Sequence, residues 1–185
     1  MGTEAVTGAT ADTTGDTTGD GSDRPTDGTV RAADVVAELY RRDDAARAFG
    51  IELVDAGPGR AVVEMAVRAD MCNGYDLCHG GMTFTLADTA MAFASGSHNQ
   101  TALAAAASID FLRPVPRGAV LRATAEERWL KGRTGLYDVR VELDDGSLVA
   151  MFHGRTVRAG GAVVIPDRVD AKNGEIDDLD TRGGA

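Results

Sequence analysis

The sequence predicts an α+β domain in which one long buried helix is wrapped by a curled antiparallel sheet. Residues 80–97 are almost all apolar or small, and a helix without a polar face is expected in the core. Four strand-like runs follow this helix, at 102–113, 119–129, 135–143 and 147–158. A helix and antiparallel strands that occupy separate parts of the chain are typical of the α+β class.

The elements before the long helix are a shorter helix and a hairpin. Residues 31–49 place apolar side chains three and four positions apart, which predicts an amphipathic helix that ends at Gly50. The runs 51–54 and 61–67 predict two strands joined by a glycine-rich turn. Residues 70–79 predict a loop, because they contain the Asn-Gly turn signal.

The strands after the long helix are separated by short polar turns. Residues 136–143 alternate apolar and polar side chains, as expected of a strand with one buried face. The sequence Asp144-Asp145-Gly146 then predicts a tight hairpin turn before the last strand.

The acidic charge of the chain is concentrated at its two ends. The 185 residues carry a net charge of −10, and residues 1–29 and 166–185 each hold six acids, against one and three bases. Both segments lack the apolar residues that a core needs, so we predict disordered acidic tails there and one domain at 30–165. The nearly neutral domain has no basic patch, which argues against nucleic acid as a partner.

The sequence also indicates the cellular compartment of the protein and whether it contacts a membrane. No run approaches the ~18 apolar residues of a membrane-spanning helix, and the first residues show no basic start followed by an apolar stretch. The two cysteines, Cys72 and Cys78, are too few for a disulfide scaffold, and nothing in the sequence forces them to pair. We therefore expect a cytoplasmic protein without membrane contact.

Asp88 is the one ionisable residue in the long helix. A carboxylate in a buried helix is costly unless it is paired, solvated in a pocket or functional. No Lys, Arg or His lies three or four positions away to pair with it within the helix. Two interpretations stay open: a structural carboxylate tied to the backbone amides of a neighbouring loop, or a functional one facing a ligand cavity.

The start of the long helix is a second candidate site. Gly80-Gly81 leaves backbone N–H groups accessible, and the positive end of the helix dipole favours a developing oxyanion there. On its own, the pattern with His79 favours tight packing, with the histidine as a cap. Asp88 lies nine positions beyond His79, ~13 Å along a helix, so the two do not meet within one chain. Joint action would require a second subunit.

Other catalytic patterns are missing from the sequence. It contains no G-x-S-x-G nucleophile elbow, no H-E-x-x-H motif and no P-loop. A Cys-x5-Cys with three scattered histidines is not a zinc pattern, so no metal is expected. Several cations fall at strand ends or loops, where they are solvated by default and would contact phosphate only if the ligand were anionic. These cations are Arg113, Lys131, Arg133, Arg155 and Arg158.

Six blocks of the core are distinctive when taken together. They are Asn73-Gly74, Cys78-His79-Gly80-Gly81, Leu86-Ala87-Asp88-Thr89-Ala90, Ser108-Ile109-Asp110-Phe111-Leu112-Arg113-Pro114, Gly132-Arg133-Thr134-Gly135-Leu136-Tyr137-Asp138-Val139 and Phe152-His153-Gly154-Arg155. In this order and spacing, they resemble the phenylacetate-pathway (PaaI-type) acyl-CoA thioesterases of the hotdog fold. The resemblance extends from about residue 34 to residue 161.

The resemblance implies a hotdog domain that forms homo-oligomers, usually dimers of dimers, with two sites across each dimer interface. It implies that Asp88 is the catalytic carboxylate, acting as nucleophile on the thioester carbonyl or as general base for water. The backbone N–H of Gly81 from the other subunit would polarise that carbonyl. Asn73 and His79 would orient the carbonyl or the attacking group.

The resemblance also implies a substrate. We expect hydrolysis of an aryl or hydroxyaryl acyl-CoA, such as a phenylacetyl-CoA derivative, with no cofactor, because coenzyme A is part of the substrate. The alternatives are a medium-chain or quinone-precursor ester, acyl-CoA binding without catalysis, and hydratase activity. Tyr75 and residues 95–100 depart from the family pattern close to the expected acyl pocket. Substrate contacts are expected from Gly80, Thr89, Lys131, Gly132, Arg133, Thr134 and Arg155.

Overall fold

The computed structural model describes residues 30–164, so the tails predicted at 1–29 and 166–185 lie outside the described residues. The elements of this part of the chain are α1 (Ala32–Arg42), α2 (Asp44–Phe49), β1 (Ile51–Gly57), β2 (Arg60–Ala66), the 3₁₀ turn η1 (Ala69–Met71), α3 (Gly80–Gly96), β3 (Ala102–Phe111), β4 (Val120–Lys131), β5 (Thr134–Leu143) and β6 (Leu148–Arg158).

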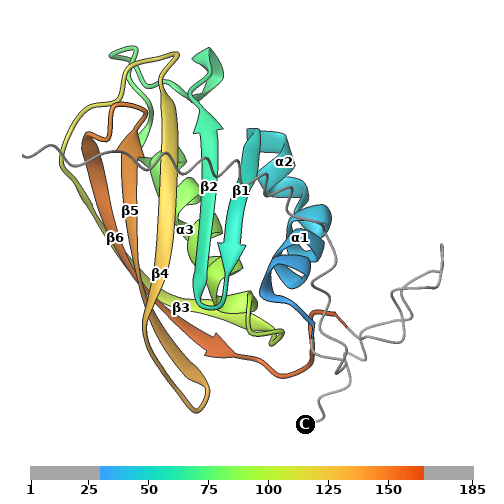
Figure 1. Ribbon diagram of the computed structural model, residues 1–185. Coiled ribbons are helices and arrows are strands. Elements are labelled where there is room, and N and C mark those ends of the chain that lie inside the picture. The colour runs from blue at the N-terminus through green and yellow to red at the C-terminus, as the bar shows by residue number, and fades with distance from the viewer. Residues whose placement is uncertain (1–29, 165–185) are drawn as a thin grey trace, which may run out of the picture.

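The six strands form one antiparallel sheet in the order β1-β2-β4-β5-β6-β3, and α3 lies against one face of it (Figure 1). Strands that follow one another directly, such as β4 and β5, pair as hairpins. β3 instead pairs with β6 at the far edge, because α3 carries the chain across the sheet before β3 begins. The predicted α+β arrangement, with a central helix and an antiparallel sheet, is confirmed.

The core is built around α3. Its side chains Leu86, Met91 and Phe93 are buried, and the helix packs against every strand of the sheet. β5 contributes alternate residues such as Val139, as its alternating sequence predicts. Gly154 in β6 is required by a close approach, because a Cβ at that position would overlap the Met91 sulfur. Within residues 30–164, no helix combines the length and apolarity needed to cross a membrane.

The single helix predicted over 31–49 is wrong, because the structure breaks it at Asp43. The Asp43 side chain accepts a hydrogen bond from the Ala46 N–H at 2.8 Å and caps the start of α2. An N-cap residue leaves the helical backbone region, so a new helix begins after it. Gly50 ends α2 in the left-handed conformation, with φ of 67°, as predicted.

The two edges of the sheet differ in how they are covered. β1, at one edge, contacts both α1 and α2, which lie beside it in Figure 1. β3, at the other edge, has eight exposed residues among its ten. In the described part of the chain, no strand pairs with its outer side. An uncovered edge of this kind is a template for pairing with another chain.

Candidate active site

The start of α3 is capped by the residue that precedes it. His79 has extended backbone, and its Nδ1 accepts a hydrogen bond from the Gly81 N–H at 3.0 Å. An accepting ring nitrogen carries no proton, so His79 holds this amide with its unprotonated Nδ1. The Gly81 N–H, which the family resemblance assigns to a substrate carbonyl, therefore already has a hydrogen-bond partner within the chain.

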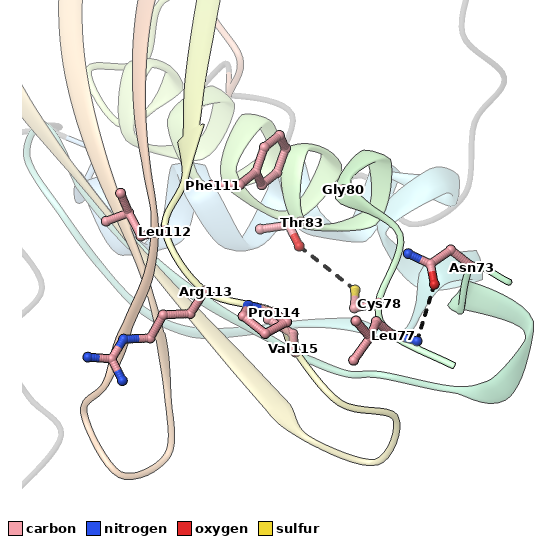
Figure 2. Close-up of a pocket in the computed structure, with 10 residues that line it drawn as sticks. All are labelled: Asn73, Leu77, Cys78, Gly80, Thr83, Phe111, Leu112, Arg113, Pro114 and Val115. Atoms are coloured by element: carbon pink, nitrogen blue, oxygen red, sulfur yellow. Dashed lines mark hydrogen bonds between the residues drawn. The ribbon is translucent and has the colours of Figure 1, made fainter. Parts of the chain in front are cut away.

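Asn73 shapes the loop that leads to this helix start. Its Oδ1 accepts hydrogen bonds from the N–H groups of Tyr75 at 2.9 Å and Leu77 at 3.3 Å. The Asn73 carbonyl accepts a third from the Asp76 N–H at 3.0 Å, which closes a tight turn. Figure 2 shows the Asn73 amide nitrogen on the side of the loop that faces the start of α3. The Asn73 side-chain oxygen is thus used within the loop, whereas its NH₂ group makes no hydrogen bond within residues 30–164.

A cavity of about 330 Å³ opens at the start of α3 (Figure 2). It lies between the 73–78 loop, the first turn of α3 and the segment that follows β3. Gly80 allows a close approach here, because a Cβ would lie 3.0 Å from the tip of the Phe111 ring, which would have to shift. The lining residues are Asn73, Leu77, Cys78, Gly80, Thr83, Phe111, Leu112, Arg113, Pro114 and Val115.

Sequence reasoning missed most of this lining. The segment 111–114 lies in one of the six matching blocks, but apart from Arg113, named as a possible phosphate contact, no role was predicted for it. The only signal in the sequence was the run of Phe, Leu and Pro at the end of a predicted strand. This residue pattern does not distinguish a segment that faces a ligand from an ordinary strand end. Only the antiparallel pairing of β3 with β6 places this strand end beside Gly80.

Asp88 lies in the middle of α3 and outside this cavity. Its side chain is half-buried, and within residues 30–164 it has no hydrogen bond or ion pair. Burial without a partner raises the pKa of Asp88 above its ordinary value. The interpretation of Asp88 as a structural carboxylate tied to loop amides is therefore wrong for the described chain.

One stripe of α3 remains accessible, and Asp88 belongs to it. Gly81, Thr85, Asp88 and Ala92 follow one another at spacings of four, three and four, and none of them is fully buried. The neighbouring Thr89 is likewise half-buried. Residues on the other sides of the helix pack against the sheet. The accessible stripe therefore joins the predicted carboxylate to the predicted amide along the same face of α3.

The predicted coenzyme contacts lie at the other end of the sheet. Lys131, Gly132, Arg133 and Thr134 form the β4–β5 hairpin, where Gly132 supplies a positive φ of 59°. The Arg133 Nε donates a hydrogen bond to the Arg158 carbonyl at 2.8 Å, which leaves its NH₂ groups outward. Figure 1 shows this hairpin at the bottom of the sheet, opposite the loops that lead into α3. One chain alone therefore does not bring these cations to the cavity.

Arg155 lies on the outer face of the sheet, among residues of three of the six sequence blocks. There a second cavity, of about 550 Å³, borders Arg155, Ser108 and a small charged cluster. The Asp138 carboxylate accepts hydrogen bonds from His153 at 2.7 Å and from Arg128 at 2.9 Å. Burial opposes ionisation, but these two bonds prevail and lower the pKa of Asp138.

Tyr75 and residues 95–100, which depart from the family pattern, lie at different places in the structure. Tyr75 is exposed on the 73–78 loop, next to the cavity at the start of α3. Residues 95–100 lie at the opposite end of α3, so within one chain they are remote from that cavity. Among the described residues, no group of three or more His, Cys, Asp or Glu side chains is placed to hold a metal ion.

Comparisons with known proteins identify the family of this chain. A model of the family described as "Thioesterase superfamily" matches residues 75–150. The Escherichia coli K12 protein named acyl-coenzyme A thioesterase PaaI is 44% identical over 125 residues, which cover 68% of this chain and 89% of that protein. The chain belongs to the thioesterase superfamily.

Solved structures give this thioesterase the hotdog fold. The E. coli PaaI structure superposes with a TM-score of 0.68 at 41% identity, covering 71% of this chain and 98% of that one. A Streptococcus mutans UA159 protein, solved bound to acetyl CoA, superposes with a TM-score of 0.59 at 25% identity. That match covers 60% of this chain and 90% of the other. The hotdog fold implied by the six sequence blocks is confirmed.

Proposed function

We propose that this thioesterase hydrolyses an aryl acyl-CoA of the phenylacetyl-CoA type to the free acid and coenzyme A. The observation that carries the proposal is the unpaired, half-buried Asp88 carboxylate on the accessible stripe of α3. The 44% identity to an acyl-coenzyme A thioesterase, and the acetyl CoA held by a structural neighbour, support the substrate class. We also propose a cytoplasmic location, because two cysteines are too few for the disulfide scaffold of a small secreted domain.

The proposed site is shared between two copies of the chain. Antiparallel pairing of β3 with β3 of a second copy would satisfy the uncovered edge of the sheet. It would also cover Leu103, which is 61% exposed, and Phe111, which is 55% exposed. A homodimer formed in this way, and a pair of such dimers, is the assembly that we propose.

Strand pairing supplies the geometry that one chain lacks. The cationic hairpin lies at the Ala102 end of β3, because Thr134 pairs with Val157 and Val157 with Leu103. The cavity at the start of α3 lies at the Phe111 end. A two-fold axis through β3 reverses the strand, so the hairpin of one copy approaches the cavity of the other. Lys131 and Arg133 then supply positive charge for the phosphates of coenzyme A.

The chemistry starts from the Asp88 carboxylate. Its raised pKa makes it a stronger base than an exposed aspartate, and it acts either as nucleophile on the thioester carbonyl or as general base for water. The oxyanion that forms accepts a hydrogen bond from the Gly81 N–H of the second copy, once His79 has released it. The carbon–sulfur bond then breaks, and coenzyme A leaves as a thiolate that needs little protonation. In the nucleophile route water then hydrolyses the mixed anhydride on Asp88 to the free acid, and in the general-base route Asp88 returns the proton that it took from water to the thiolate or to solvent. Coenzyme A is part of the substrate, so the scheme uses no further cofactor.

The remaining predicted contacts have positioning roles in this proposal. The free NH₂ group of Asn73 points from the loop toward the start of α3, where it can hold the thioester carbonyl. Thr89 borders Asp88 on the accessible stripe and contacts the acyl group. Gly80 keeps the passage beside Phe111 open, and Arg155 offers an exposed guanidinium on the outer face of the sheet.

The test is release of free thiol from a panel of acyl-CoA esters by wild type, Asp88→Asn and Asp88→Ala. We expect aryl esters to be preferred, and turnover to fall by about 100-fold or more in both variants, while ester binding persists. Glu52→Gln is the matched control, because Glu52 is an exposed acid on β1, far from α3's accessible stripe. Full activity in folded Asp88→Ala would eliminate the proposed role of Asp88. Tight binding without hydrolysis by wild type would show a binding protein instead.

A further inference from the structure

The two cysteines lie directly opposite each other at the base of the 73–77 loop. Cys72 and Cys78 form an isolated antiparallel bridge. The hydrogen bonds on either side of it run from the Asn73 N–H to the Leu77 carbonyl at 2.8 Å, and from the His79 N–H to the Met71 carbonyl at 2.9 Å. This pattern makes the cysteines a non-hydrogen-bonded pair, the arrangement in which opposite side chains approach most closely.

The backbone geometry of such a pair suits a disulfide. Opposite Cα atoms in a non-hydrogen-bonded pair are about 4.5 Å apart, and disulfides join Cα atoms about 4.4–6.8 Å apart. Residues opposite each other in an antiparallel ladder also direct their side chains to the same face. The bridge would close only the loop between the two cysteines, with no rearrangement of the surrounding strands.

The two thiols differ in access, as a reactive pair requires. Cys72 is half-buried, and its Sγ lies 3.4 Å from the Arg68 carbonyl. Cys78 is buried, with its Sγ 3.8 Å from the Thr83 Oγ1 (Figure 2). Both are free thiols, and neither has a cationic partner among the described residues. The accessible thiol can react first with an external oxidant, and the buried one can then resolve the product.

We propose that Cys72 and Cys78 form a reversible disulfide that crosslinks the loop carrying Asn73. The oxidant is a low-molecular-weight disulfide. The Cys72 thiolate attacks one of its sulfurs, which forms a mixed disulfide and expels one small thiol. The Cys78 thiolate then attacks the Cys72 Sγ and expels the second thiol. Two protein thiols are thus oxidised, and the external disulfide is reduced to two thiols.

The crosslink would act on the proposed active site through the chain. Cys78 must leave Thr83 to reach Cys72, and the next residue, His79, holds the Gly81 N–H. Because Asn73 follows Cys72 directly and His79 follows Cys78 directly, turning the two cysteine side chains into a disulfide would shift both positioning residues slightly, without moving the strands. This consequence rests on the proposed function, and small displacements of positioning groups can lower turnover by about 100-fold. We expect oxidation to reduce turnover, and a dithiol reductant to restore it.

The chemical test is independent of catalysis. The full chain is treated with excess oxidised glutathione, and its intact mass and free thiols are measured before and after reduction. We expect loss of two hydrogens and of both thiols, with a monomeric band on a non-reducing gel. Peptide mapping should then join Cys72 to Cys78. Persistence of both thiols, two glutathione adducts, or a disulfide between chains would overturn the proposal.

Cys72→Ser is the matched variant, because Cys72 does not line the cavity. It keeps Cys78 in place but removes the partner, so we expect its basal turnover to be unchanged and insensitive to oxidised glutathione. Wild type that forms the intrachain disulfide at unchanged turnover would refute the link to the active site. Equal inhibition of Cys72→Ser would refute it as well, because the crosslink cannot form in that variant. If neither protein hydrolyses any ester, the proposed function fails while the mass measurement still decides the disulfide.

Discussion

At the scale of the residue, Asp88 is a carboxylate held at a cost to stability. Burial raises its pKa, and no hydrogen bond or ion pair within residues 30–164 offsets that burial. The folded chain therefore binds a proton at Asp88 more tightly than the unfolded chain does. Its contribution to stability is full at pH values below the unfolded pKa, and it is lost as the pH rises through the folded pKa. Ionisable groups perturbed in this way are concentrated at functional sites, which supports the role that we propose for Asp88.

Asp88→Asn should therefore raise the melting temperature at neutral pH, because it removes a charge that burial disfavours. The gain should vanish in acid, below the ordinary aspartate pKa of ~3.9, where Asp88 is protonated in both states. Thermal unfolding of both proteins across that range checks the prediction. Asp138→Asn is the control with the opposite sign, because hydrogen bonds from His153 and Arg128 lower the pKa of Asp138. A melting-temperature difference between Asp88→Asn and wild type that stays the same across this pH range would contradict the argument.

At the scale of the element, the surface of α3 is divided between packing against the core and an accessible stripe. Most of it is buried against the strands, and small residues allow the close contact. Its accessible stripe carries Gly81, Asp88 and Thr89. The sequence predicts the buried helix and its lone acid, because both follow from residue types along one segment. It does not predict which side of the helix stays accessible, since small residues occur on every side and leave little periodicity.

Packing between α3 and β6 leaves no room for an added methyl group. Gly154→Ala should destabilise the fold by about 1–3 kcal/mol, because its Cβ would meet the Met91 sulfur and lie 2.8 Å from the Phe152 ring. Gly57→Ala is the matched control, since a Cβ there meets nothing within 4 Å and Gly57 has no positive φ. Urea unfolding of both variants measures the difference. Equal free energies of unfolding for the two variants would show that the α3–β6 contact repacks around the added methyl group without cost.

At the scale of the whole molecule, the uncovered sheet edge at β3 is the basis of the shared site that we propose. The cavity, the carboxylate and the cationic hairpin lie at three separate places in one chain. The carboxylate and the hairpin were predicted as parts of one site, whereas most of the cavity lining was not, and we propose that pairing of β3 with a second copy joins the three. Sequence alone indicates the residue types of a site, whereas their assembly depends on an interface that no local pattern encodes.

Leu103→Asp should weaken the proposed dimer by at least about tenfold, because it replaces an apolar contact at the β3 edge by a charge. Turnover should fall in parallel at low protein concentration. Val54→Asp is the matched control, since Val54 is 44% exposed on β1 at the other edge. Sedimentation velocity over a dilution series, with activity measured on the same samples, follows both quantities. A fully active Leu103→Asp monomer would disprove a shared site.

The sequence by itself determined the fold class, the buried helix, its single carboxylate and the glycines at its start. These depend on periodicity and residue type over short segments, which local sequence records. It failed at Asp43, where one capping side chain divides a continuous apolar pattern into α1 and α2.

Only the tertiary structure decided what lies beside what. It placed the end of β3 against Gly80, the thiols of Cys72 and Cys78 opposite each other, and the Lys131–Thr134 hairpin at the far end of the sheet. The physical reason is that strand order and register come from hydrogen bonds between segments far apart in the chain. Any strand with alternating apolar and polar residues can make those bonds. Which strands pair is therefore decided by the packing of the whole molecule.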